Sequence, residues 1–363
     1  MADAVRVLAV AQAPALGGAE LALLRLARLL PERGFEVAAT VPAPGPLADA
    51  LAAEGVPFDT LPLGGLARGR WSGAVAGWPR ARAAMRRFAP QLVWLNGVVT
   101  LRAAPALGRD ALLVPYLHDL LENRPRPWRG DRFWARTPIV MCASEAVARH
   151  AAQAGAPAER LRVVWAPVER TEPAPQPEWR DGGPVVGYVG RIEPRKGTLD
   201  LLRAFPALLE RWPRAKLVIV GSAELGAPRD YARAVEEAAQ ALGEHVRLLG
   251  RVEHAPALMP WFDVLAVPSA REPFGTVAAE ALAAGTPVVA TRSGGMEEYV
   301  RPGVDGELVA PGDPGALADA LDAVLARASE RVASARAHAD RFHPGRIADA
   351  VCVCFRDALA SAR

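Results

Sequence analysis

The chain has 363 residues, of which 51% are hydrophobic and 23% are charged, and its formal net charge is +3. These values exclude a disordered or fibrous protein, and the length predicts two domains. No run of about 20 uncharged apolar residues occurs, so no membrane-spanning helix is predicted. Three cysteines without zinc-type spacing, and an N-terminus without a signal-peptide pattern, favour a reducing, cytoplasmic setting.

In the first half, short β-branched runs alternate with alanine- and leucine-rich segments of helical length, a pattern typical of parallel α/β sheets. The pair Gly17-Gly18 follows the first predicted strand and opens a helix over about 19–30. The strands predicted here are Val5–Val10, Val37–Val41, Leu92–Leu95, Leu112–Leu117, Ile139–Ala143 and Leu161–Val164.

The alternation stops at residues 169–183, which are rich in proline and lack apolar periodicity, so we expect an extended linker there. It restarts at 184, and we expect two doubly wound Rossmann-like domains, 1–168 and 184–340. The remaining segment, 341–363, contains a helix over about 346–360 that can pack on either domain, including back on the N-terminal one. The elements predicted in the second half are strands Val185–Val189, Lys216–Val220, Val246–Leu248, Val264–Val267 and Val288–Ala290 and helices Leu199–Arg211 and Tyr231–Leu242.

A first group of candidate ligand-binding residues follows the strand at 185–189. Gly190-Arg191 ends that strand, and Lys196-Gly197 comes just before a helix. Open α/β sheets bind ligands at the carboxyl ends of their strands, and glycine lets the backbone approach a ligand closely. Arg191 and Lys196 then present two cations to one diphosphate, unless they are ordinary surface charges.

A second group follows the strand at 264–267. Glu272 lies in the loop after it, and Pro273-Phe274-Gly275 opens a helix whose free backbone N–H groups suit phosphate or sugar oxygens. Glu280 stands in this otherwise apolar helix. Each carboxylate can accept hydrogen bonds from vicinal hydroxyls, although ordinary loop and helix charges are the alternative.

These two groups, in this order, resemble glycosyltransferase family four. The resemblance lies in Gly-Arg-x4-Lys-Gly at 190–197 and Glu-x7-Glu at 272–280 with Pro-Phe-Gly inside it. It implies a glycosyltransferase-B fold of two Rossmann-like domains facing a central cleft, with the acceptor on the N-terminal domain and the nucleotide sugar on the C-terminal one. It further implies a retaining hexosyltransferase that uses a UDP-sugar or GDP-sugar as co-substrate and needs no metal or other cofactor.

The resemblance also implies roles for single residues. Arg191 and Lys196 hold the diphosphate and assist its departure, Glu280 holds the ribose, and Glu272 holds the hydroxyls of the donor sugar. The remaining donor-binding residues implied are Gly17 and Gly18 of the N-terminal glycine loop, Val252 against the base, and Phe274, Gly275 and Thr276 with their backbone amides.

Two further positions in the first half carry residue types that resemble those of the family at the same places. His118, at the end of the strand 112–117, would face the reacting carbon, although a lone histidine at a strand end is often structural. Ser144-Glu145 is more typical of a helix cap. The chain contains no Asp-x-Asp pair, so we expect no metal site, and cations must offset the charge on the departing diphosphate.

The first domain is basic, which indicates an anionic partner. Residues 60–109 contain eight arginines and no acid, and Trp71, Trp78, Met85 and Phe88 are interleaved with them. The segment Arg124–Arg136 adds arginines with Trp128, Phe133 and Trp134. The pattern suits peripheral contact with a lipid head-group layer at the inner face of the membrane. A soluble anionic acceptor, a small secondary metabolite or a merely solvated surface are alternatives, and nucleic acid is not expected.

Three other functions compete with a glycosyltransferase at this point. The same fold hosts nucleotide-sugar epimerases, and a non-catalytic nucleotide-sugar-binding protein would share the donor residues. An NAD-dependent oxidoreductase is disfavoured, because the Gly-x-Gly-x-x-Gly pattern that binds dinucleotides is missing.

Overall fold

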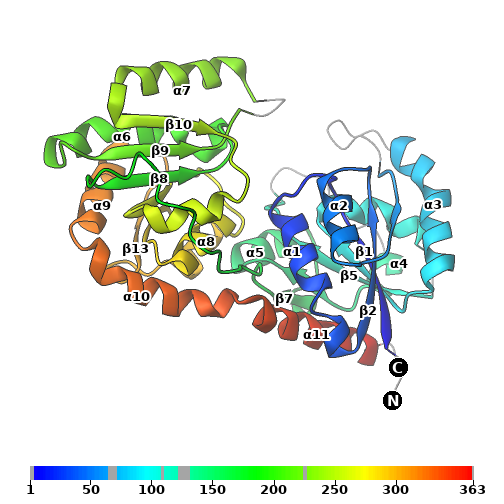
Figure 1. Ribbon diagram of the computed structural model, residues 1–363. Helices are drawn as coiled ribbons and strands as arrows, with labels where there is room; N and C mark the ends of the chain where they lie inside the picture. Colours follow the sequence, from blue (N-terminus) through cyan, green and yellow to red (C-terminus); the bar gives the residue numbers. More distant parts are fainter. Residues whose placement is uncertain (1–3, 64–71, 108–109, 122–130, 224–226, 362–363) are drawn as a thin grey trace. The chain divides into compact units, whose positions relative to one another are not determined.

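The computed structural model describes residues 4–63, 72–107, 110–121, 131–223 and 227–361. The chain divides into two compact units (Figure 1). The first comprises Met1–Pro167 and Phe342–Arg363, and the second comprises Val168–Arg341. Each unit contains one parallel sheet with helices on both of its faces, so the predicted pair of doubly wound α/β domains is confirmed.

The sheet of the first unit has the strand order β3-β2-β1-β4-β5-β6-β7, and the order reverses between β1 and β4. Six of these strands were predicted. The seventh, β3, escaped prediction because it has only three residues, Phe-Asp-Thr, at the edge of the sheet. The strands are β1 (Val5–Val10), β2 (Phe35–Val41), β3 (Phe58–Thr60), β4 (Leu92–Asn96), β5 (Leu112–Leu117), β6 (Val140–Cys142) and β7 (Leu161–Val163).

Helices cover both faces of this sheet. The C-terminal helix α11 packs beside α1 and β5 (Figure 1), where Phe355 contacts the rings of Phe35 and Trp94 at 5.4 and 6.1 Å between centroids. Ser144 caps α5, as predicted, by accepting a hydrogen bond from the Val147 amide at 3.0 Å. The helices are α1 (Gly18–Ala27), η1 (Pro31–Arg33), α2 (Pro46–Ala53), α3 (Ser72–Phe88), η3 (Val98–Ala106), α4 (Asp131–Trp134), α5 (Glu145–Gln153), η4 (Ala158–Arg160) and α11 (Pro344–Ala360).

The sheet of the second unit has the order β10-β9-β8-β11-β12-β13 and reverses between β8 and β11. Its last strand, β13, was not predicted, because Gly-Glu-Leu-Val has only two consecutive apolar residues. The strands are β8 (Val185–Val189), β9 (Lys216–Val220), β10 (Val246–Gly250), β11 (Val264–Val267), β12 (Val288–Thr291) and β13 (Gly306–Val309).

One face of this second sheet packs on α6, α7 and α9, and α8 and α10 pack together on the other. The core between the sheet and α6 contains Leu201, Phe205 and Leu208, which lie on one side of the helix at helical spacing. The helices are η5 (Pro194–Lys196), α6 (Thr198–Arg211), α7 (Arg229–Ala241), η6 (Gly243–His245), η7 (Ala255–Trp261), α8 (Thr276–Ala284), η8 (Gly295–Glu298), α9 (Pro314–Leu325), α10 (Ala328–Ala339) and η9 (Asp340–Phe342).

Residues 169–183 contain no helix or strand, but they are not a free spacer. The Ala174 amide donates a hydrogen bond to the Ala257 carbonyl at 2.9 Å, and the Ala174 carbonyl accepts one from the Trp261 indole at 2.8 Å. Arg180 donates two hydrogen bonds, at 2.6 and 2.8 Å, to the carboxylate of Asp263. The segment is therefore fastened to the second unit by specific contacts, which its proline content did not reveal.

The described aromatic residues of the basic region belong partly to the core of the first unit. Trp78, Met85, Phe88, Phe133 and Trp134 are partly buried and pack against the core of the first unit, because each lies on the inner side of its helix. Part of each of these side chains is therefore taken up by the core, and the remaining part lies at the surface. Of the other residues of that pattern, Arg68, Arg70, Trp71, Arg109 and 124–130 lie outside the described residues.

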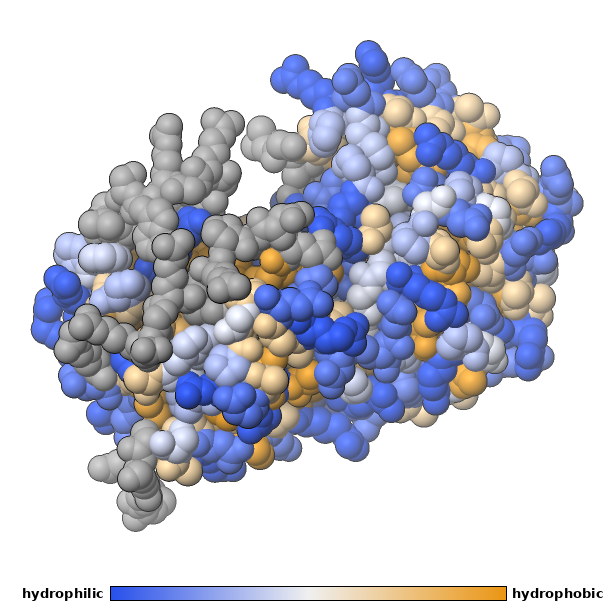
Figure 2. Space-filling view, turned by 180° about the vertical axis from the view of Figure 1, so that it is seen from behind, coloured by the Kyte–Doolittle hydropathy of each residue, from blue (hydrophilic) through white to orange (hydrophobic). Residues whose placement is uncertain are grey.

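Hydrophilic side chains cover most of the described surface in Figure 2. Within the described residues, no helix has both the length and the apolar character needed to cross a membrane.

Candidate active site

The two loops that flank the reversal of strand order in the second sheet form the core of the site. One runs from β8 to α6 and contains Arg191 and Lys196, and the other runs from β11 to α8 and contains Glu272. Because β8 and β11 are hydrogen-bonded neighbours, their following loops lie side by side at the carboxyl edge of the sheet. The amide of Ala270 donates to the carbonyl of Arg195 at 2.8 Å, which joins the loops directly.

Glycine is required where these loops cross. Gly197 has a φ of +69°, and a Cβ there would lie 2.0 Å from the carbonyl oxygen of Pro268. A Cβ on Gly221, after β9, would lie 1.8 Å from the Gly190 carbonyl. Both distances are far below contact, so any larger residue would push the loops apart.

Lys196 and Glu272 form an ion pair with 2.6 Å between Nζ and Oε2. Their side chains are only 17% and 10% exposed, so little water screens the pair. The backbone of Glu272 is fixed by the next loop along the sheet. Its amide donates to the Ser293 carbonyl and its carbonyl accepts from the Gly295 amide, both at 3.0 Å. Two side chains that the sequence assigned to different parts of a donor are therefore direct partners.

Arg191 is more open, with half of its side chain exposed, and it pairs with Glu193 at 3.1 Å. Arg195 shares the same carboxylate at 2.7 Å. The carbonyl of Arg191 accepts a hydrogen bond from the hydroxyl of Tyr188, the buried fourth residue of β8. Glu193 and Tyr188 were missed by the sequence reasoning, although their place beside Arg191 was a usable signal.

A buried tyrosine forms hydrogen bonds to the backbone just before α8. Tyr299 donates toward the carbonyls of Phe274 and Gly275, at 3.0 and 2.7 Å, and Gly275 adopts a φ of +86° at the N-cap. The first amides of an α-helix have no acceptor within the helix, so those at the start of α8, beginning with Thr276, are directed out of its end. Phe274 itself is buried and packs on the ring of Tyr299. An anion can therefore be bound at this end.

Both glutamates of the second motif lie close to Tyr299. Burial, and next the negative charges of Glu272, Glu298 and Glu280, hold the pKa of this phenol well above its usual value. Glu280 lies on α8 and is half-buried. Val252 lies at the same edge of the sheet, two residues after β10, but two strands away from the reversal. The structure thus brings the diphosphate and sugar candidates together and places the base candidate farther along the edge.

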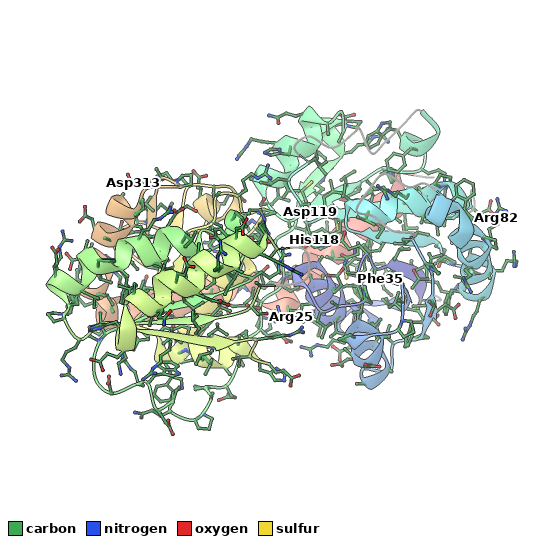
Figure 3. All side chains as sticks on the ribbon, turned by 90° about the horizontal axis from the view of Figure 1, so that it is seen from above. Arg25, Phe35, Arg82, His118, Asp119 and Asp313 are labelled. Carbon is green, nitrogen blue, oxygen red and sulfur yellow. The ribbon has the colours of Figure 1, made fainter. Side chains whose placement is uncertain are left out.

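The candidates of the first unit lie at the equivalent edge of its own sheet. Gly17 caps α1 and Gly18 is its first residue, and both are exposed, while His118 is the first residue after β5. Figure 3 shows His118 beside Asp119. His118 Nε2 lies 3.0 Å from Oδ1 of Asn96, and Nδ2 of Asn96 donates to the carbonyl of Ala19 at 2.9 Å. Burial lowers the pKa of His118 to about 3, so the imidazole is neutral.

Glu20, in the first turn of α1, is a buried acid that the sequence reasoning did not select. Its side chain is 3% exposed, and a Cβ on Gly17 would lie 3.0 Å from its Oε2. Burial raises the pKa of Glu20 to about 7. Within the described residues no cluster of three or more His, Cys, Asp or Glu side chains has the arrangement of a metal site.

Two parallel α/β units, each with polar side chains at the point where strand order reverses, define the class of glycosyltransferase-B folds. Comparisons with known proteins agree. Residues 16–172 match the family model described as Glycosyltransferase Family 4, and residues 183–327 match the one described as Glycosyl transferases group 1. The chain therefore belongs to glycosyltransferase family 4.

Individual relatives share this organisation. A D-inositol 3-phosphate glycosyltransferase from Acidothermus cellulolyticus is 33% identical over 306 residues, which cover 74% of this chain and 67% of the relative. One from Corynebacterium urealyticum is 41% identical over 166 residues, 44% of this chain but only 39% of the relative. The crystal structure of Anabaena HepE in complex with UDP superposes with a TM-score of 0.80 at 25% identity, covering 97% of this chain and 100% of HepE.

Proposed function

We propose that this protein is a retaining, metal-independent glycosyltransferase that moves a hexosyl group from a nucleotide-diphosphate sugar to an acceptor hydroxyl. The observation that supports this most is that Arg191, Lys196 and the amino end of α8 all belong to the two loops that flank the reversal point of the second sheet. Three sources of positive charge there suit a diphosphate. The solved relative with UDP supports a UDP-sugar donor, with GDP-sugars as the second group to test.

The proposed reaction breaks the bond between the sugar's anomeric carbon and the diphosphate oxygen. Lys196 and Arg191 stabilise the negative charge that develops on that oxygen, and the acceptor hydroxyl attacks the same face of an oxocarbenium-like sugar. The departing phosphate oxygen takes the hydroxyl proton, so all charges and atoms balance. The diphosphate ligands proposed are cations and amides, which supports a reaction that needs no metal.

Glu272 has a double part in this proposal. Its carboxylate binds hydroxyls of the donor sugar, and it also neutralises Lys196, 2.6 Å away, when no donor is bound. A buried lysine left without a partner would be costly, so the pair keeps the cation in place before the diphosphate arrives. Glu280, farther along α8, binds the ribose hydroxyls.

The test is turnover with a panel of UDP- and GDP-sugars, with and without acceptor extracts. We expect nucleoside diphosphate to appear only with an acceptor, and the glycoside product to keep the anomeric configuration of the donor. Conversion of the sugar's configuration without an acceptor would indicate an epimerase instead. Tight binding without any turnover would indicate a non-catalytic nucleotide-sugar-binding protein.

We also propose that the acceptor is an anionic polyol or its lipid-linked form, bound by the first unit. The relatives named for D-inositol 3-phosphate support an anionic polyol. On α3, Arg80, Arg82 and Arg86 are exposed, and Arg82 lies on the outer side of the helix in Figure 3. Each such charge contributes about 1 kcal/mol of attraction to an anionic membrane at physiological salt. Co-sedimentation with anionic but not neutral vesicles, lost at high salt, would support the lipid-linked form and a peripheral position at the inner face of the membrane.

A further inference from the structure

The carboxyl ends of β4 and β5 place two polar side chains against each other inside the first unit. Asn96 is the last residue of β4 and pairs in register with Tyr116 of β5, two residues before His118. The Asn96 side chain is 0% exposed, so each of its polar atoms needs a partner within the protein. It has two, the carbonyl of Ala19 and the imidazole of His118.

The chemistry of these partners fixes the direction of both hydrogen bonds. A backbone carbonyl only accepts, so the amide nitrogen of Asn96 must be the atom that faces Ala19, at 2.9 Å. The amide oxygen therefore faces His118. That oxygen also only accepts, so Nε2, 3.0 Å away, must carry a hydrogen. The opposite tautomer would set two acceptors against each other at a buried position, which is strongly unfavourable.

A neutral imidazole carries one hydrogen, so the other ring nitrogen, Nδ1, has a free lone pair. Burial keeps the ring neutral by lowering its pKa to about 3. Within the described residues, Asn96 is the only hydrogen-bond partner of the His118 side chain. A nitrogen lone pair accepts a hydrogen from a hydroxyl but repels a phosphate oxygen. The group that His118 suits is therefore a hydroxyl of a substrate.

We propose that Asn96 is a positioning residue that holds His118 as the Nε2–H tautomer, so that Nδ1 accepts a hydrogen bond from a hydroxyl of the acceptor, which the first unit binds. The substrate part of this inference rests on the proposed function, whereas the tautomer does not. The bond from Asn96 to Ala19 adds a second effect. Ala19 follows Gly17-Gly18 directly, so the same amide ties the glycine loop to the histidine.

The tautomer is measured in the ligand-free wild-type protein by ¹⁵N–¹H correlation NMR of the histidine rings, with His118 assigned by its loss in His118→Gln. We expect hydrogen on Nε2 and an unprotonated Nδ1 throughout pH 5–8. A hydrogen on Nδ1, or an imidazolium in that range, would overturn the proposal whatever the activity. This arm needs no variant to be active.

The substrate part is tested with Asn96→Asp. Its carboxylate still accepts from Nε2, but it loses the hydrogen bond to the Ala19 carbonyl and adds a negative charge. That charge raises the pKa of His118 and places a second hydrogen on Nδ1 at lower pH. We expect kcat/KM to be about tenfold lower at low pH and to recover as His118 loses that proton, while wild type shows no such step. The pH of the step must match the His118 titration seen by NMR.

Thr100→Val is the matched control. Thr100 is also fully buried after β4, and its hydroxyl donates to the Gly97 carbonyl at 2.6 Å without touching His118. The control should leave the His118 signals and the pH profile unchanged. A profile for Asn96→Asp that follows wild type, across the pH range in which NMR shows His118 gaining its second hydrogen, would remove the substrate role of Nδ1. Complete absence of glycosyl transfer in wild type would contradict the proposed function and the substrate role together, and the NMR arm would still decide the tautomer.

Discussion

The buried carboxyl of Glu20 predicts a specific dependence of stability on pH. Its pKa is raised from 4.5 to about 7, first by burial and also by the negative charge of Asp119, while nearby backbone N–H groups oppose the shift. In the unfolded chain the same carboxyl ionises near 4.5. The folded protein therefore binds more protons than the unfolded chain between these values.

The sign and size of the effect follow from that difference. The stabilisation from protonated Glu20 is fully present below pH 4.5, falls as pH rises toward 7, and is gone above it. A shift from 4.5 to about 7, at about 1.4 kcal/mol per unit, gives a loss of about 3 kcal/mol. Glu20→Gln cannot ionise, so its stability relative to wild type should rise by about this amount across the same window.

The assay is hydrogen exchange of the β1 and β4 amides in wild type and Glu20→Gln from pH 4.5 to 8, corrected for intrinsic exchange rates. Exchange in these strands reports the opening of the first unit alone, whereas a global unfolding curve of a two-unit chain combines both units. His118 is present in both proteins, and its ring stays neutral in the folded state over this range but gains a proton in the unfolded chain below pH 6.5. Its opposite contribution therefore cancels in the difference. Glu32→Gln, which removes an exposed carboxyl of the same unit, controls for net charge. A wild-type-to-variant difference that stays constant with pH refutes the reasoning.

Three predictions concern the proposed donor site. Lys196→Ala should weaken nucleoside-diphosphate binding, measured by calorimetry, about 10- to 100-fold. Arg191→Ala should weaken it less, because half of that side chain is exposed. Unchanged affinity in both variants would remove these residues from the site. Glu280→Gln should weaken binding of the nucleoside diphosphate itself, whereas Glu272→Gln should mainly weaken binding of the intact sugar donor, and equal shifts would contradict the two roles. Turnover should persist in excess chelator, since cations and amides bind the diphosphate; activity that disappears and returns with magnesium or manganese would disprove the metal-free mechanism.

Much of the framework was present in the sequence. Parallel strands are buried on both faces, so they consist of continuous apolar runs such as Leu112–Leu117 and Val264–Val267, and these were predicted at their observed places. Because ligands bind after such strands, Arg191, Lys196 and Glu272 could be named as candidates from the sequence, and the resemblance to the family supplied their predicted roles. Strands that depend on neighbours instead of their own composition, β3 and β13, were missed.

Only the tertiary structure decided which side chains meet and which are buried. Lys196 and Glu272 are 76 residues apart, and their pairing follows from the adjacency of β8 and β11, which no local pattern encodes. Trp78 was selected by its place among the arginines, and only the structure shows that part of it packs on the core, because the side of a helix that turns inward is set by the sheet beneath it. The raised pKa of Glu20 and the neutral imidazole of His118 arise in the same way. Both depend on desolvation by segments that are distant in sequence, so the residues around each group in the sequence do not predict the burial.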